Sequence, residues 1–102
     1  MTAPRHIRVG PVTIGNDLPV VFLCGPCQIE SRAHALETAA ALAEMARAAG
    51  VPLIYKSSFD KANRTSVNAA RGIGMAEGLA ILAEVRETTA LPVLTDVHAP
   101  EQ

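Results

Sequence analysis

The sequence has few aromatic residues, no tryptophan and no long apolar run, and these absences exclude several classes of protein. Aromatic residues make up 3% of the 102 residues, too few for a surface that stacks nucleic-acid bases. The formal net charge is -1, so no general attraction to nucleic acid or to an anionic membrane is expected. No apolar run approaches the roughly 20 residues that span a bilayer. We therefore expect neither nucleic-acid nor membrane partners.

Cysteine is also scarce, and the N-terminus lacks a secretion signal. Residues 1–15, MTAPRHIRVGPVTIG, have no apolar core of the signal-peptide type. Two cysteines in such a chain argue against a structural disulfide framework and indicate a cytoplasmic protein. The hydrophobic content of 49% excludes disorder, and 102 residues suit one domain.

Strand patterns and helix patterns alternate along the chain. Residues 6–14 are typical of a short hairpin. Residues 18–25, 51–58 and 91–98 are predicted strands, and the first is a continuous apolar run of the kind buried on both faces. This order predicts an α/β fold with a parallel sheet.

Two helices are predicted between these strands, over residues 32–49 and about 75–89. Ser31 is suited to cap the first helix and Gly50 to end it. The apolar residues expected to face the core are Leu36, Ala39, Leu42, Ala43 and Ala46 in the first helix, and Leu79, Leu82 and Val85 in the second.

The chain is short for such a fold. A (β/α)8 barrel needs about 250 residues, and an open sheet of three strands would keep an uncovered face and an unprotected edge. We therefore expect residues 1–102 to be a single, truncated domain, namely a hairpin followed by the first three strands and two helices of something larger.

Each predicted strand begins apolar and ends in polar or reactive residues. In chain order these are Cys24 and Cys27, Lys56 and Ser58, and Asp96 and His98. One explanation is that strands end where solvent begins. However, chemistry in parallel α/β folds gathers at the carboxyl ends of the strands, and this favours a functional site there.

A basic segment follows the second strand. Residues 55–66, YKSSFDKANRTS, contain both lysines of the chain, Lys56 and Lys61. Lysine binds phosphate as a point charge, whereas arginine grips it with two parallel donors, and Arg64 lies in the same segment. Although a solvated loop is the alternative, such loops rarely need an aromatic residue like Phe59. We predict a site for an anionic ligand. The GIG of residues 72–74 lacks the third glycine and the strand-turn-helix context of a phosphate loop and is interpreted as a turn.

Four segments resemble 3-deoxy-D-manno-octulosonate 8-phosphate synthases, in the order and spacing of that family. They are GPCQIES, YKSSFDKANRTS, RGIGMAEGL and LTDVH, and the resemblance covers nearly the whole chain. It implies the N-terminal portion of a (β/α)8 TIM barrel and, in the full-length enzyme, a homotetramer. It also implies condensation of phosphoenolpyruvate with D-arabinose 5-phosphate, with release of phosphate, for lipopolysaccharide core biosynthesis.

A sister family makes 3-deoxy-D-arabino-heptulosonate 7-phosphate and stays an alternative. Its members typically have Lys-Pro-Arg-Thr-Ser where this chain has Lys-Ala-Asn-Arg-Thr-Ser at residues 61–66. The Ala62-Asn63 pair is the mark of the arabinose 5-phosphate enzymes. Thr65 departs from their usual serine but keeps the hydroxyl.

The resemblance also implies roles for individual residues. Lys56 and Lys61, with Ser58, would hold phosphoenolpyruvate. Arg64 and Thr65 would hold the phosphate group of arabinose 5-phosphate.

The remaining implied roles concern the sugar and the chemistry. Asn63 and Asp96 would bond sugar hydroxyls, and His98 lies close to the site. Lys61, Asp96 and His98 are the candidate catalytic residues.

Cys27 is implied to bind a metal. Family members with cysteine at this position bind a divalent transition metal such as iron, zinc, manganese or a similar ion, and a thiolate suits iron, zinc or related ions. The other ligands of the family lie on later strands. Cys24 has no role by resemblance, and we expect it to pack as a small apolar residue.

Two other functions stay open. The spelling Cys-Gly-Pro-Cys at residues 24–27 is that of thiol oxidoreductases, although a reactive thiolate of that kind sits at a helix N-terminus. A non-catalytic anion-binding fragment is the second possibility. We expect residues 1–102 alone to be catalytically inactive.

Overall fold

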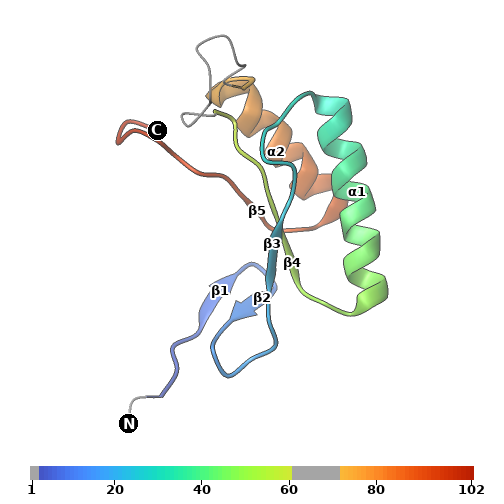
Figure 1. Ribbon diagram of the computed structural model, residues 1–102, viewed down its shortest axis with the longest axis vertical. Coiled ribbons are helices and arrows are strands. Elements are labelled where there is room, and N and C mark those ends of the chain that lie inside the picture. The colour runs from blue at the N-terminus through green and yellow to red at the C-terminus, as the bar shows by residue number, and fades with distance from the viewer. Residues whose placement is uncertain (1–2, 61–71) are drawn as a thin grey trace.

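The computed structural model describes residues 3–60 and 72–102 and contains seven elements of regular structure. They are β1 (Ile7–Val9), β2 (Val12–Ile14), β3 (Phe22–Cys24), α1 (Arg32–Ala49), β4 (Leu53–Lys56), α2 (Met75–Thr89) and β5 (Val93–Leu94) (Figure 1). β1 and β2 form an antiparallel hairpin, and β3, β4 and β5 form a parallel sheet in that order. The predicted α/β class and the predicted order of elements are confirmed.

The N-terminal hairpin turns at Gly10, whose φ of 58° lies in the left-handed region that glycine adopts without strain. Ile7 pairs with Ile14 and Val9 with Val12. Figure 1 shows the hairpin at one end of the molecule, below the sheet and far from the N-terminus of α2. The hairpin therefore lies at the end of the sheet opposite to the carboxyl ends of β4 and β5.

Helix α1 has the ends that the sequence predicts. The Ser31 hydroxyl accepts a hydrogen bond from the backbone N–H of His34 at 3.1 Å, which satisfies a free donor of the first turn. Gly50 adopts φ 69°, and its N–H donates to the carbonyls of Ala46 and Arg47. This left-handed cap ends the helix and sends the chain into β4.

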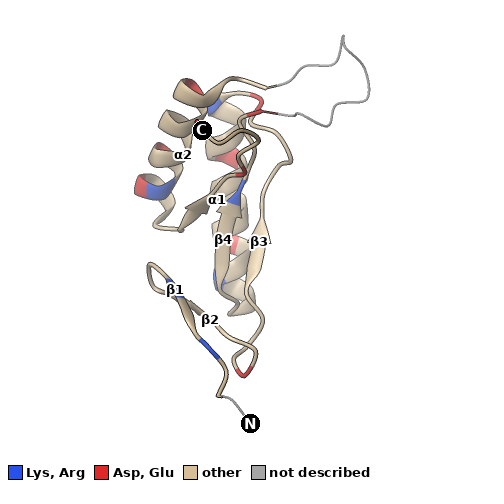
Figure 2. Ribbon diagram, turned by 90° about the vertical axis from the view of Figure 1, so that its left-hand side faces the viewer, with Lys and Arg blue, Asp and Glu red and all other residues tan. Residues whose placement is uncertain are grey.

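Both helices cover one face of the parallel sheet (Figures 1 and 2). The Arg32 guanidinium of α1 binds the Glu84 carboxylate of α2, with Nε 2.7 Å from Oε2, and so joins the two helices at their surface. The buried core between helices and sheet consists of Ile29, Ala35, Ala39, Tyr55, Phe59, Ile81, Leu82 and Val85. Leu36 and Leu42, predicted to face inward, pack against this core from its margin.

Leu79 is the predicted core residue that the structure places differently. Its side chain is 44% exposed, whereas Leu82 and Val85 are buried as predicted. The buried stripe of α2 instead includes Gly78 and Ile81. Leu79 lines an open groove beside β5, at the edge of the sheet where no further strand pairs among the described residues. The spacing of apolar residues in α2 is compatible with a buried or an exposed Leu79, and the position of β5 decides between the two.

The prediction that the first parallel strand is buried on both faces is wrong. Phe22 is 41% and Leu23 52% exposed. Among the described strands β3 lies at an edge of the sheet, and the helices cover only one face of this sheet (Figure 1). Tyr55 belongs to the core between sheet and helices. Its neighbour Lys56, and Leu94 that pairs with Lys56, therefore lie on the other face. Apolar residues of this open face, such as Leu23 and Leu94, therefore meet solvent in the described part of the chain.

Phe59 anchors the chain just after β4. Its side chain is 1% exposed and belongs to the core. Gly78 of α2 makes room for it, because a Cβ at Gly78 would come within 2.6 Å of the Phe59 Cβ. The Phe59 carbonyl accepts the N–H of Gly74 at 3.2 Å. The segments on either side of residues 61–71 are therefore held together at Phe59.

Candidate active site

The candidate site lies where β4 and β5 end. Lys56 is the last residue of β4, Ser58 follows two residues later, and Asp96 lies two residues beyond β5. Because β4 and β5 are parallel neighbours, their carboxyl ends are at the same edge of the sheet. The alternation of side chains along a strand then directs Lys56 and Ser58 to the same face.

Three side chains from the two strand ends form one hydrogen-bonded cluster. The Lys56 Nζ donates to the Ser58 Oγ at 3.2 Å. The Ser58 hydroxyl donates to the Asp96 Oδ1, which also lies 3.9 Å from the Lys56 Nζ. Ser58 thus links a cation to a carboxylate at the carboxyl ends of two neighbouring strands.

One residue of the cluster is buried, and the other two are partly accessible to solvent. Ser58 is fully buried, whereas the side chains of Lys56 and Asp96 are 29% and 37% exposed. An ammonium group that is fixed on one side and open on the other is suited to bind an anion from solvent. The geometry therefore fits the predicted anionic ligand.

Asp96 is held in its ionised form. Burial alone would raise the pKa of Asp96, but the Ser58 hydroxyl, a backbone N–H, and the charges of Lys56 and His98 together lower that pKa below its ordinary value. A carboxylate that is ionised and hydrogen-bonded to a rigid partner can accept hydrogen bonds from further donors, including hydroxyl groups of a sugar.

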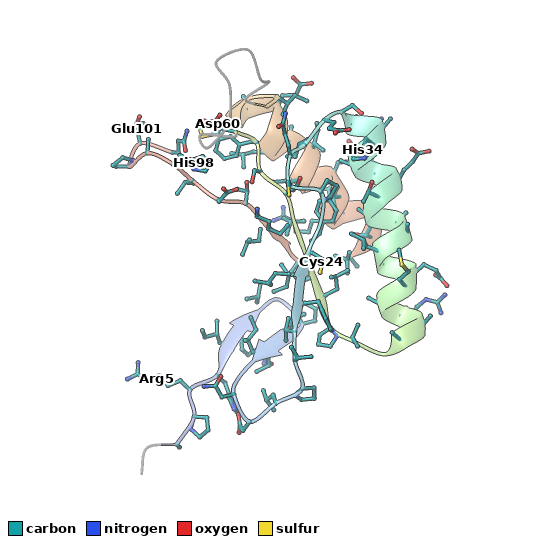
Figure 3. All side chains as sticks on the ribbon, viewed as in Figure 1. Arg5, Cys24, His34, Asp60, His98 and Glu101 are labelled. Atoms are coloured by element: carbon teal, nitrogen blue, oxygen red, sulfur yellow. The ribbon has the colours of Figure 1, made fainter. Side chains whose placement is uncertain are left out.

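His98 lies beside this cluster. Its Nε2 is 3.2 Å from the Asp96 Oδ2 and 2.9 Å from the backbone carbonyl oxygen of Asp60 (Figure 3). His98 therefore contacts the same carboxylate that Ser58 contacts.

The turn that contains Cys27 is fastened to the end of β4. The backbone N–H of Ser58 donates to the Cys27 carbonyl at 3.2 Å, and Gln28 forms a parallel bridge with Ser58. The buried Ser57 hydroxyl donates to the Pro26 carbonyl at 2.6 Å. Sequence reasoning missed Ser57, because its partner is a backbone carbonyl, which the sequence alone does not mark.

Comparison with known proteins identifies the family of this chain. Residues 4–102 match the DAHP synthetase I family. The chain belongs to this family. A 2-dehydro-3-deoxyphosphooctonate aldolase of Methylobacterium radiotolerans is 60% identical over 99% of this chain and 36% of the relative. The proteins of the same name from Bradyrhizobium diazoefficiens and Caulobacter vibrioides are 57% and 65% identical, over 99% and 86% of this chain and 36% and 31% of those relatives.

These names confirm the resemblance seen in the sequence, because 2-dehydro-3-deoxyphosphooctonate aldolase is another name for 3-deoxy-D-manno-octulosonate 8-phosphate synthase. The chain spans about a third of the length of the curated relatives that it matches.

The described residues of this family member do not form a complete metal site. In residues 3–60 and 72–102, no group of three or more His, Cys, Asp or Glu side chains is placed to hold an ion. The thiol of Cys27 is exposed and free. It is suited to supply one ligand, and a metal would need the others from outside these residues.

The structure does not favour a dithiol redox centre. The N-cap of α1 is Ser31, four residues after Cys27. Cys27 therefore does not lie at the helix N-terminus, where a thiolate would be stabilised. Cys24 is half-buried on β3 and lines a small apolar cavity with Phe22 and Leu42. Figure 3 shows Cys24 at mid-sheet, away from Asp60 and His98. This placement agrees with the predicted packing role of Cys24.

Four predicted site residues, Lys61, Asn63, Arg64 and Thr65, lie outside the described residues, and their roles stay predictions.

A cavity of about 540 Å³ lies at the opposite end of the sheet, near the hairpin. The two threonine hydroxyls that line it donate to backbone carbonyls, Thr88 to Glu84 at 2.9 Å and Thr89 to Val85 at 2.7 Å. These hydroxyls are therefore not free to donate to a ligand, and the volume of this cavity alone does not mark it as the functional site.

Neither helix in the described ranges has the length and apolar character needed to cross a bilayer.

Proposed function

We propose that the complete protein condenses phosphoenolpyruvate with D-arabinose 5-phosphate and water to give 3-deoxy-D-manno-octulosonate 8-phosphate and phosphate. One observation carries the proposal. The Lys56–Ser58–Asp96 cluster lies at adjacent strand ends of a chain 60% identical to a named 2-dehydro-3-deoxyphosphooctonate aldolase.

We also propose that the chain forms the first three strands of a (β/α)8 barrel. Three features support this. The strand order β3, β4, β5 follows the chain, both helices cover the same face (Figure 1), and the other face exposes Leu23 and Leu94. A barrel has sequential strands, helices only outside and apolar side chains inside. In a doubly wound sheet, by contrast, helices cover both faces.

In the proposed reaction, the π electrons of the C2–C3 double bond of phosphoenolpyruvate form the bond from C3 to the aldehyde carbon, and the aldehyde oxygen takes up a proton. Water adds to C2 and loses a proton. The C–O bond to phosphate then breaks, and phosphate leaves. Positive charge develops at C2, which lies between the phosphate and carboxylate groups. Fixed cations around those two anionic groups hold them in place and stabilise their negative charge. Lys56 is suited to this task, because Ser58 holds its ammonium group before substrate arrives.

Asp96 is assigned to the sugar. Its carboxylate is already oriented by Ser58 and is partly open to solvent, so it can accept a hydrogen bond from a sugar hydroxyl. Asn63 is assigned to the same sugar, Lys61 to phosphoenolpyruvate, and Arg64 with Thr65 to the phosphate group of arabinose 5-phosphate.

Cys27 is assigned to a divalent transition metal as one thiolate ligand. The other ligands come from outside the described residues. When bound, such an ion supplies Lewis-acid chemistry for the aldehyde or the attacking water. The complete protein is further proposed to be a cytoplasmic homotetramer that serves lipopolysaccharide biosynthesis.

The experiment is a product assay on the complete protein. Phosphate release from phosphoenolpyruvate should require arabinose 5-phosphate, and an eight-carbon acid should form in equal amount. Since phosphoenolpyruvate supplies three carbons, a seven-carbon product requires a four-carbon aldose phosphate. Faster turnover with that shorter sugar would support the sister activity instead.

A matched pair of variants tests the assignment of the basic segment. Arg64→Ala removes a charge-assisted contact and should lower kcat/KM for arabinose 5-phosphate by roughly 30- to 1000-fold. Lys61→Ala should mainly impair phosphoenolpyruvate. If Arg64→Ala leaves the arabinose 5-phosphate parameters unchanged, the assignment of residues 61–65 is wrong.

A further inference from the structure

One nitrogen of His98 has two close partners, and both can only accept hydrogen bonds. The Nε2 lies 2.9 Å from the Asp60 carbonyl oxygen and 3.2 Å from the Asp96 Oδ2. Asp60 lies in the chain that leaves β4, within the basic segment, and Asp96 follows β5. Figure 3 shows His98 next to Asp60. The imidazole thus bridges the chain that leaves β4 and the chain that leaves β5.

These contacts determine which ring nitrogen carries a hydrogen. A backbone carbonyl oxygen has no hydrogen to give, and an ionised carboxylate has none either. The low pKa of Asp96 keeps that carboxylate ionised at neutral pH. Two acceptors facing Nε2 therefore require an Nε2–H, in the neutral ring as well as in the charged one.

We propose that His98 is a positioning residue whose Nε2–H fixes the Asp96 carboxylate and ties the two strand ends together. Nε2 then has no lone pair with which to take a proton from a substrate, so it does not act as the general base. The proposal rests on the proposed function for its effect on kinetics, but not for the position of the hydrogen.

The two oxygens of Asp96 are held from different sides. Oδ2 faces His98, while Oδ1 accepts from Ser58 and lies near Lys56. With a partner on each oxygen, rotation of the carboxylate about its last bond is opposed. Loss of His98 would remove the contact between its ring and Oδ2, and the carboxylate would be less firmly oriented for the sugar.

His98 is itself held in place by the turn that follows. Its backbone N–H donates to the Gln102 Oε1 at 2.7 Å, and the Gln102 N–H donates to the Ala99 carbonyl at 3.1 Å. These contacts involve the backbone of His98 and not its ring. Gln102 is therefore a matched control position, since its side chain contacts the same residue without contacting Asp96.

The direct test is neutron diffraction from crystals of the complete protein exchanged into D2O, at neutral pH and without substrate. The proposal expects nuclear density for deuterium on Nε2 of His98, directed toward Asp60 and Asp96. Density for deuterium on Nδ1 alone would overturn it. This result is independent of the reaction, so it decides the proposal even if the proposed function fails.

Kinetics then separate a positioning role from proton transfer. His98→Ala should lower kcat/KM for arabinose 5-phosphate about ten- to a hundredfold, the range expected for a lost hydrogen bond to a charged group. His98→Gln places an amide N–H near the position of Nε2 and cannot transfer a proton, so it should recover activity to within about threefold of the unmodified protein. Gln102→Ala should stay within about twofold. Equal losses in His98→Gln and His98→Ala would overturn the positioning role.

Discussion

Replacement of Ser58 by alanine is the sharpest perturbation of the candidate site. Ser58 is fully buried, and its hydroxyl accepts from Lys56 and donates to Asp96. Ser58→Ala removes both contacts and changes little volume. A hydrogen bond to a charged group contributes about 1.5–3 kcal/mol, so kcat/KM should fall roughly 10- to 150-fold if that energy is used to orient Lys56 and Asp96 in the transition state.

Ser57→Ala is the control for loss of a buried hydroxyl. Ser57 is equally buried, but its hydroxyl donates to the Pro26 carbonyl and not to a charged side chain. The N–H of Ser58 still holds the Cys27 carbonyl in this variant. Ser57→Ala should therefore lower the free energy of unfolding by about 1 kcal/mol, with kcat/KM within about threefold of the unmodified protein.

The assay is steady-state kinetics of the complete protein with each substrate varied in turn, together with urea denaturation of both variants. If Ser58→Ala keeps full kcat/KM, or if both variants lose activity equally, the cluster does not orient the substrates.

Three further predictions follow from particular contacts. Gly78→Ala forces a methyl group against Phe59 and should destabilise the protein by about 1–3 kcal/mol in urea denaturation; an unchanged midpoint would contradict the packing. The folded-state pKa of Asp96 is lowered below its ordinary 3.8, so its stabilising effect is present above that pH and is lost as the pH falls through the lowered pKa. The free energy of unfolding should thus fall less steeply with decreasing pH in Asp96→Asn than in the unmodified protein. An identical pH dependence in both proteins would contradict the lowered pKa of Asp96. Cys27→Ala should remove most bound metal by elemental analysis, while Cys24→Ala should not; equal loss would support a shared role.

Sequence reasoning located the elements and the strand ends because those signals are local. The Ser31 and Gly50 caps, the hairpin and the alternation of strand and helix depend on neighbouring residues alone, and the structure confirms each. The sequence also placed Lys56 and Asp96 at carboxyl ends of strands, and in the structure these two ends are neighbours.

Features that depend on nonlocal packing were not predictable in the same way. The exposure of Leu79 depends on which element covers the groove beside β5, and the exposure of Leu23 depends on the edge position of β3. Helical periodicity and an apolar run do not carry that information.

Site details that arise from backbone contacts were also out of reach. Ser57 acts through the Pro26 carbonyl, and His98 meets the Asp60 carbonyl. A backbone carbonyl is present at every residue, so the sequence alone does not mark these two as partners. Phe59 is an intermediate case, because an aromatic residue in a basic segment did signal an unusual environment, and the structure shows it in the core.

We propose that substrate binds at the carboxyl ends of β4 and β5, and a crystal structure of the complete protein with phosphoenolpyruvate bound would decide this. An anionic oxygen of the ligand should lie at hydrogen-bond distance, about 3 Å, from the Nζ of Lys56, next to the Ser58–Asp96 pair. Phosphoenolpyruvate bound elsewhere, for example in the 540 Å³ cavity near the hairpin, with Lys56 free of contact to it, would contradict the claim.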